Sequence, residues 1–295
     1  MATSQLTAAG WIILGVSLVV AAVALVRAVM PPSDRRVARW SSHHGLALTD
    51  ASRSLVAGYL RRTRSLEVAG ATLGWLSSPV YVGFVGRPFP LGDSWVVLAV
   101  VGSLLGAALA ELTFLGQRQP LPAVRAAMLT PRTLTDYVPG AIMWAIRALP
   151  VAGVALAVAY AVAYAVAPND LQRSVDPSIG MLAMSLLVVA FAVLIEWFLK
   201  TIVNRPQPAI TNDLLAADDA LRAGSIHALS AAALALILLS LGWALVSLGG
   251  VSADAQAGEV LPWLGAACDV GALIVWIGLG HAANWRVHRD APVVS

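Results

Sequence analysis

The chain has 295 residues, a formal net charge of +3 and a mean hydropathy of +0.78, and 59% of its residues are hydrophobic while only 12% are charged. Soluble domains carry roughly a quarter charged residues, so this composition excludes an ordinary soluble fold and indicates a lipid environment. The single cysteine, Cys268, excludes an internal disulfide and a cysteine-based zinc site.

The first apolar run covers residues 9–30 and is long enough to cross about 30 Å of hydrocarbon. No Lys or Arg precedes it and no suitable cleavage site follows it, which favours an uncleaved span with its N-terminus outside. Residues 31–65 then carry seven arginines that alternate with apolar residues, as in an amphipathic helix: Arg35, Arg36, Arg39, Arg53, Arg61, Arg62 and Arg64. We expect a cationic helix on the inner membrane surface.

Six further apolar runs cover residues 66–86, 92–116, 138–165, 178–200, 225–250 and 261–285. The fourth span ends in an alternating A-V-A-Y-A-V-A-Y run, but an isolated strand in lipid leaves its backbone unpaired, so a helix is expected there too. The sequence therefore predicts an all-α, polytopic transmembrane helical bundle of about seven spans, in which residues 1–295 form a single membrane domain.

The basic residues set the expected orientation. Seven spans place four segments on one side, and together with Lys200 these hold fifteen of the nineteen basic residues: 31–65, 117–137, 201–224 and 286–295. The opposite loops hold only Arg87 and Arg173. The positive-inside rule therefore predicts the N-terminus outside and the C-terminus inside. Because this topology accounts for the positive charge, no nucleic-acid partner is expected. The excess of Arg over Lys suggests a bacterial chain, and we expect a multi-pass protein of the plasma (inner) membrane.

Tryptophans and small residues agree with this arrangement. Five tryptophans lie near the ends of expected spans, where an amphipathic ring favours the headgroup zone: Trp11, Trp95, Trp197, Trp263 and Trp285. In the third span Gly102, Gly106 and Ala110 form a row of small residues spaced four apart, which predicts close contact with another helix.

Four charged residues inside the spans are candidate functional groups, because charge is costly in lipid. Arg147 lies about nine residues into the fourth span from its inner end, and Glu196 and Glu111 lie about five residues from the inner ends of the fifth and third spans, a difference within the reach of an arginine side chain. We therefore predict that Arg147 pairs with Glu196 or Glu111, either as a link between helices or as part of a substrate or proton pathway. Asp269 enters from the outer side, and is a candidate for a polar cavity or for a residue near the wet interface.

The most polar stretch between two spans runs from Glu196 to His227 and contains the only lysine, Lys200. Its residues 213–222 are expected to form a short helix on the inner surface, in which Asp218 and Arg222, four apart, pair. Many permeases bind a motor ATPase through a short inner-face helix between two spans. Such a helix is also an ordinary connection between two spans. The candidate partner contacts are Lys200, Arg205, Asp218, Asp219 and Arg222.

Three motifs in this stretch, R-P-Q-P at 205–208, D-D-A-L-R at 218–222 and S-I-H-A-L-S-A-A-A at 225–233, resemble a group of actinobacterial polytopic membrane proteins without an assigned activity. Members are similar in size, and some are encoded beside ABC-type ATPases. The resemblance implies a transport or membrane-accessory role and names no substrate and no catalytic residue.

A second similarity, to type 2 phosphatidic acid phosphatases, is partial. That family has a Lys, six residues and Arg-Pro, then Pro-Ser-Gly-His, and later Ser-Arg with a His that attacks the phosphate and an Asp. Here the six-residue spacing after Lys200 leads to Gln207-Pro208, Gly224–His227 keeps only the Ser and the His, and the later motif is absent. Without the attacking His the covalent mechanism fails. We expect no enzyme activity, and a degenerate phosphatase is the third hypothesis.

No metal or cofactor is expected, since His43-His44 has no third ligand at a suitable spacing and no phosphate-binding motif is present. The leading hypothesis is a transport-related, ABC-type permease-like subunit that works with a separate cytoplasmic ATPase bound to the loops 117–137 and 201–224. The alternative is a scaffold or sensor that binds a partner or anionic lipid through inner-face segments such as 33–65. Besides the bilayer and the ATPase, a second copy of the chain is a candidate partner.

Overall fold

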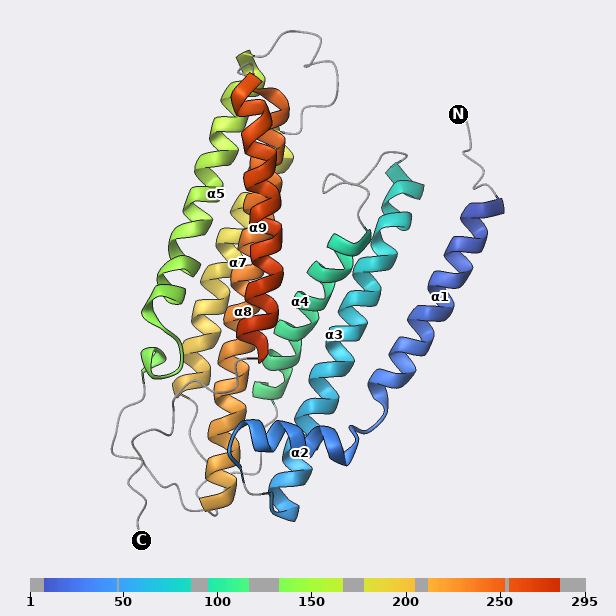
Figure 1. The fold of residues 1–295 in the computed structure, drawn as a ribbon, viewed down its shortest axis with the longest axis vertical. Coiled ribbons are helices and arrows are strands. Elements are labelled where there is room, and N and C mark those ends of the chain that lie inside the picture. The colour runs from blue at the N-terminus through green and yellow to red at the C-terminus, as the bar shows by residue number, and fades with distance from the viewer. Residues whose placement is uncertain are drawn as a thin grey trace. The chain divides into compact units, whose positions relative to one another are not determined.

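The computed structural model describes residues 8–46, 48–85, 95–116, 133–166, 178–204, 212–252 and 255–281. Every regular element in these ranges is a helix, which confirms the expected all-α class (Figure 1). The chain divides into two compact units. The N-terminal unit comprises Met1–Trp40 and Leu48–Phe114, and the C-terminal unit comprises Ser41–Ala47 and Leu115–Ser295.

The N-terminal unit contains α1 (Ala8–Val29), α3 (Asp50–Val85), α4 (Trp95–Gly116) and most of α2 (Asp34–His43). α3 contacts α1, where the Ser65 hydroxyl donates to the carbonyl of Ala28 at 3.0 Å. α3 meets α4 through glycines on both helices. A Cβ added at Gly70 or Gly74 would strike the backbone of α4, and one added at Gly102 or Gly106 would strike the backbone of α3. The predicted close contact of the small-residue row is confirmed at its two glycines.

The basic segment does not form the single surface helix expected for residues 31–65. α2 ends in a turn centred on Gly45, whose φ of +64° is the left-handed conformation that glycine adopts readily. The amides of Gly45 and Leu46 close this turn on the carbonyls of Ser42 and Ser41 at 3.2 and 2.9 Å. α3 then begins at Asp50 and continues through the predicted second span without a break. Between Arg64, the last arginine of α3, and the apolar run that begins at residue 66, the sequence holds no residue that would end a helix.

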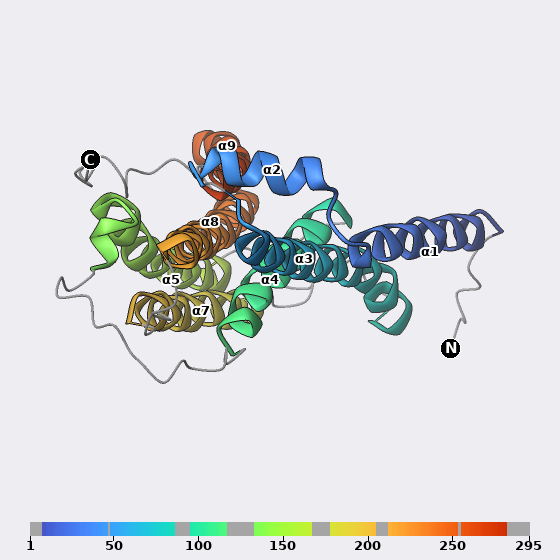
Figure 2. The ribbon, with the colours of Figure 1, turned by 90° about the horizontal axis from the view of Figure 1, so that it is seen from below.

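The C-terminal unit contains α5 (Gly140–Val166), α7 (Ser178–Asn204), α8 (Asn212–Val251) and α9 (Ala255–His281), with a short 3-10 helix, η1 (Leu134–Asp136), before α5. Within the described residues these four α-helices are long and apolar enough to cross a membrane. α8 lies at the centre and packs against α5, α7 and α9 (Figures 1 and 2). In its most apolar stretch 61% of residues are buried, against 11% in α9.

α8 corrects the expected division between an inner loop helix and the sixth span. Residues 213–222 are helical as expected, but they are the first turns of one continuous 40-residue helix and not a separate surface element. Gly224 is the only flexible residue at the expected junction, and a single glycine costs a helix about 1 kcal/mol, too little to break it. At 1.5 Å per residue α8 is about 60 Å long, twice the thickness of a bilayer's hydrocarbon core.

The alternating end of the fourth expected span is helical, as predicted. α5 continues to Val166, and the fourfold spacing of Tyr160 and Tyr164 places both rings on one face, 6.1 Å apart and stacked. Both tyrosines are buried in a cluster with Met181 of α7 and Ala244 of α8. The helical period thus turns the aromatic residues into the unit and the intervening valines outward.

Candidate functional site

The first turns of α8 hold a buried ion pair. Asp218 and Arg222 lie four residues apart on one helix face, and Arg222 Nη2 is 2.9 Å from Asp218 Oδ2, which confirms the predicted pair. Their side chains are only 7% and 3% exposed. Arg222 Nη1 also donates to the carbonyls of Ile202 and Val203, at 3.2 and 3.1 Å. These carbonyls belong to the last turn of α7 and lack helical partners, so Arg222 caps α7 with a positive charge at its negative end.

Two further contacts bind the segment before α5 to α8. The Tyr137 hydroxyl donates to Asp219 Oδ1 at 3.3 Å, and His227 Nε2 lies 2.8 Å from the Tyr137 carbonyl oxygen. Because a carbonyl oxygen can only accept, Nε2 carries the proton. We call Tyr137, Asp218, Asp219, Arg222 and His227 the end network, and all five are buried.

The end network connects the described ends of the two segments that we expected, from the sequence, to form a docking surface. Tyr137 closes the 117–137 segment, and Asp218, Asp219 and Arg222 lie in the 201–224 segment. These three side chains point into the unit, so their contact with a partner stays a prediction, and Arg205 lies outside the described residues. Thr135, Asp136 and Asn204 are exposed at the same end. His227 and Ser225, which carry the phosphatase similarity, are 3% and 4% exposed.

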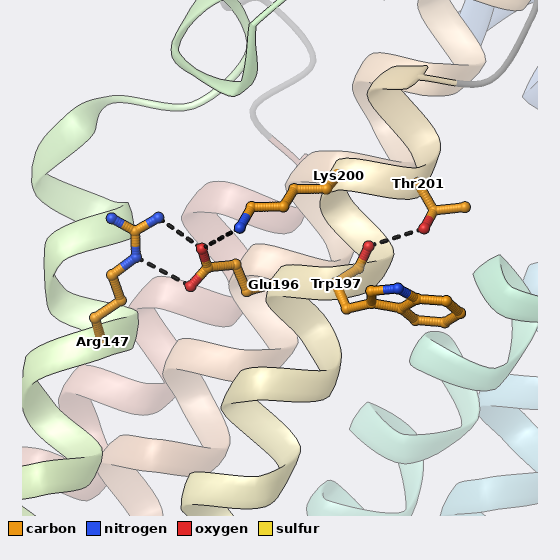
Figure 3. Close-up of polar contacts among 5 residues, drawn as sticks. All are labelled: Arg147, Glu196, Trp197, Lys200 and Thr201. Atoms are coloured by element: carbon orange, nitrogen blue, oxygen red, sulfur yellow. Dashed lines mark hydrogen bonds and ion pairs between the residues drawn. The ribbon is translucent and has the colours of Figure 1, made fainter.

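A second charged group lies on the outer surface of the C-terminal unit (Figure 3). Arg147 on α5 donates from Nε and Nη2 to the two carboxylate oxygens of Glu196 on α7, at 3.0 and 2.7 Å. Lys200 Nζ is 3.0 Å from Glu196 Oε1, one turn further along α7. The predicted pairing of Arg147 is thus confirmed with Glu196, and we call these three residues the surface triad.

Glu111, the other candidate partner of Arg147, belongs to the N-terminal unit. It is fully buried, and it accepts a hydrogen bond of 2.6 Å from the hydroxyl of Tyr59 on α3. Nearby, Arg62 Nε donates to Thr113 Oγ1 at 3.0 Å, so polar contacts as well as glycines link α3 to α4. Tyr59 was not among the expected site residues, and its 52-residue separation from Glu111 leaves no local sequence signal.

Asp269 lies on α9 against a glycine of α8. A Cβ added at Gly242 would lie 2.5 Å from Asp269 Oδ1 and 2.9 Å from the carbonyl oxygen of Gly265. The missing side chain at Gly242 therefore leaves the space that the carboxylate occupies. The role of Asp269 in a polar cavity stays a prediction.

Exposed tryptophans lie on three of the apolar helices, α5, α7 and α9. Trp197 and Trp263, both expected near span ends, are 59% and 78% exposed, and Trp144 of α5, which was not singled out, is 69% exposed. The side chains of Trp11, Trp95 and Trp285 lie outside the described residues. Exposed tryptophans near the ends of apolar helices are typical of a membrane–water interface.

In the described part of the chain, no group of three or more His, Cys, Asp and Glu residues is placed to hold a metal ion. Comparison of the chain with protein-family models, curated proteins and solved structures gives no match.

Proposed function

We propose that this chain is a multi-pass membrane protein of a bacterial plasma membrane, with about seven spans, its N-terminus outside and its C-terminus inside. In this proposal it is a transport-related, permease-like subunit that binds a separate cytoplasmic ATPase. α1, α3 and α4 form the first three spans, and the four apolar helices of the C-terminal unit form the rest. The inner segments 117–137 and 201–224 supply the docking surface.

One observation carries the proposal: at one end of the C-terminal unit, the end network links Tyr137, the last residue of segment 117–137, to α8, and links α8 to the last turn of α7. A motor protein can move membrane helices only if its docking surface is rigidly connected to them. Arg222 connects α8 to the last turn of α7, and Tyr137 connects the start of α5 to α8. A force applied at this end would therefore reach three of the four apolar helices.

The length of α8 supports the same assignment. If residues 225–250 cross the bilayer, the preceding part of α8 projects about 20 Å beyond the hydrocarbon core as a continuous helix. Figure 1 shows these first turns extending past the end of α9. A rigid extension of a membrane helix is suited to transmit motion between a soluble partner and the bilayer.

An alternative function is favoured by the N-terminal unit. Five arginines of its basic segment are exposed: Arg35, Arg36, Arg39, Arg53 and Arg61. Of these, Arg53 forms an exposed ion pair with Asp34 at 3.4 Å, which contributes little binding energy of its own. A scaffold or sensor that binds anionic lipid or an acidic partner through this surface would use the same residues.

A pull-down from native membranes in mild detergent tests the main proposal. We expect an ATPase to co-purify with the tagged protein, and expect Thr135→Arg combined with Asn204→Arg to release it. Both positions are exposed at the end network, so the long charged side chains obstruct docking without disturbing the buried ion pair.

The matched control is Glu259→Arg, at an exposed position of α9 near the opposite end of the unit, which should retain the ATPase. Failure to recover any ATPase from native membranes, or its equal release by the control, would contradict the proposal. In the first case the scaffold or sensor function becomes the better explanation.

A further inference from the structure

The surface triad lies within two exposed stripes on the outside of the C-terminal unit. On α5, Trp144, Arg147 and Val151 follow one another at helical spacing and are all exposed. On α7, Val193 and Lys200 are exposed on either side of Glu196, again three and four residues apart. The Arg147–Glu196 hydrogen bonds join the two stripes, whereas the Trp197 ring points away from the triad (Figure 3).

The triad has unused binding capacity. One carboxylate faces two cations, so the group carries a net charge of +1. Arg147 and Lys200 have 57% and 58% exposed side chains, and within the described residues their only polar partner is Glu196. A guanidinium has five N–H donors and an ammonium three. With two donors of Arg147 and one of Lys200 engaged, five N–H groups remain directed away from Glu196.

The depth of these donors fits the boundary between headgroups and acyl chains. Arg147 is seven residues from the start of α5 and Lys200 is four residues from the end of α7, which places them about 10 and 6 Å from the helix ends. Trp144 lies nearer the end of α5, whereas Val151 and Val193 lie deeper, 65% and 66% exposed. On α5 the order from the helix end inward is therefore aromatic, cationic and apolar, and on α7 the cation likewise lies nearer the helix end than the exposed valine.

We propose that the surface triad binds an anionic phospholipid, with the phosphodiester held by Arg147 and Lys200 and an acyl chain lying along Val151 and Val193. Glu196 orients the two cations and leaves them one net positive charge for the phosphate. The site rests on the membrane placement of α5 and α7 proposed above and is independent of any ATPase. It also lies on a different unit from the exposed arginines of the basic segment.

Photo-crosslinking of the full-length protein tests this site. The probe is phosphatidylglycerol with a photoreactive headgroup, reconstituted in phosphatidylcholine bilayers, and the crosslinked peptides are mapped. We expect labelling of α5 around Trp144 or α7 around Lys200. A cation near an anionic lipid contributes a factor of about five in affinity, so Arg147→Gln with Lys200→Gln should weaken labelling about 25-fold.

Three variants separate lipid binding from a purely structural link. Lys200→Gln alone keeps the Arg147–Glu196 bonds and should still reduce labelling several-fold. Glu196→Gln raises the net charge and should maintain or increase labelling even where it lowers thermal stability. Thr201→Gln, at an exposed neutral position beside Lys200, should leave labelling unchanged.

Equal labelling of the wild type and the double variant would overturn the proposal, as would equal labelling by a phosphatidylcholine probe of the same design. Excess inorganic phosphate should leave labelling intact. If it abolishes labelling, the site binds soluble phosphate and not a lipid. Because reconstitution places the chain in a bilayer before the probe is activated, a protein that fails to insert is recognised separately from one that inserts without binding lipid.

Discussion

Replacing Gly70 by alanine is expected to lower the free energy of unfolding by about 1–3 kcal/mol, the usual cost of overpacking. The new Cβ would meet the carbonyl oxygen of Gly102 at well under 3.0 Å, and that atom belongs to a helix backbone, which cannot rotate away. Closely packed backbones are a main source of helix association in lipid, so separating α3 from α4 removes contacts along the whole pair.

Gly58→Ala is the matched control, because it makes the same substitution in the same helix. No atom lies within 4 Å of its added Cβ, and alanine favours a helix over glycine by about 1 kcal/mol. We therefore expect opposite signs, stabilisation at Gly58 and destabilisation at Gly70, in unfolding measured in mild detergent. Two variants of equal stability would show that α3 and α4 are not in backbone contact.

Removing Arg222 should destabilise the C-terminal unit by about 3–5 kcal/mol, the usual cost of breaking a buried ion pair by removing one of its two members. Arg222→Met keeps the length of the side chain but removes the buried ion pair with Asp218 and the hydrogen bonds to the carbonyls of Ile202 and Val203. Combining it with Asp218→Leu also removes the buried carboxylate and should recover a large part of the loss. The measurement is a double-mutant cycle of unfolding free energies.

The comparison for this cycle is Lys200→Met. Lys200 also pairs with an acid four residues away, but its side chain is 58% exposed, and such pairs contribute at most about 1 kcal/mol. A loss at Arg222 no larger than that at Lys200 would contradict the buried geometry of the end network.

The sequence predicted the helices because each apolar run is bounded by clear polar or proline-rich segments. It also predicted two ion pairs, since the depths of Arg147 and Glu196 agree and the fourfold spacing of Asp218 and Arg222 is a local rule. The unexpected features lie at the junctions. Gly45 ends α2 while Gly224 does not interrupt α8, because a glycine ends a helix only where the chain adopts a left-handed turn.

Apart from the Arg147–Glu196 pair, side-chain contacts between distant segments were not predicted. Tyr59 and Glu111 are 52 residues apart and Tyr137 and Asp219 are 82 apart, and their pairing depends on how whole helices pack. The burial of Arg222 was not predicted for the same reason. Its sequence neighbours indicate an exposed, polar helix, but its guanidinium is directed to the end of α7, which only the tertiary structure specifies.

Labelling of single cysteines with a membrane-impermeant maleimide tests most directly whether the end network faces the cytoplasm. In a Cys268→Ser background, new cysteines replace Thr135 and Asn204 at the end network and Glu259 near the other end of the unit, all at exposed positions. In intact cells the maleimide should modify only the Glu259→Cys variant. The Thr135→Cys and Asn204→Cys variants should react only after the membrane is permeabilised. Labelling of Thr135→Cys or Asn204→Cys in intact cells would place the end network outside and contradict its role as a docking surface for a cytoplasmic partner.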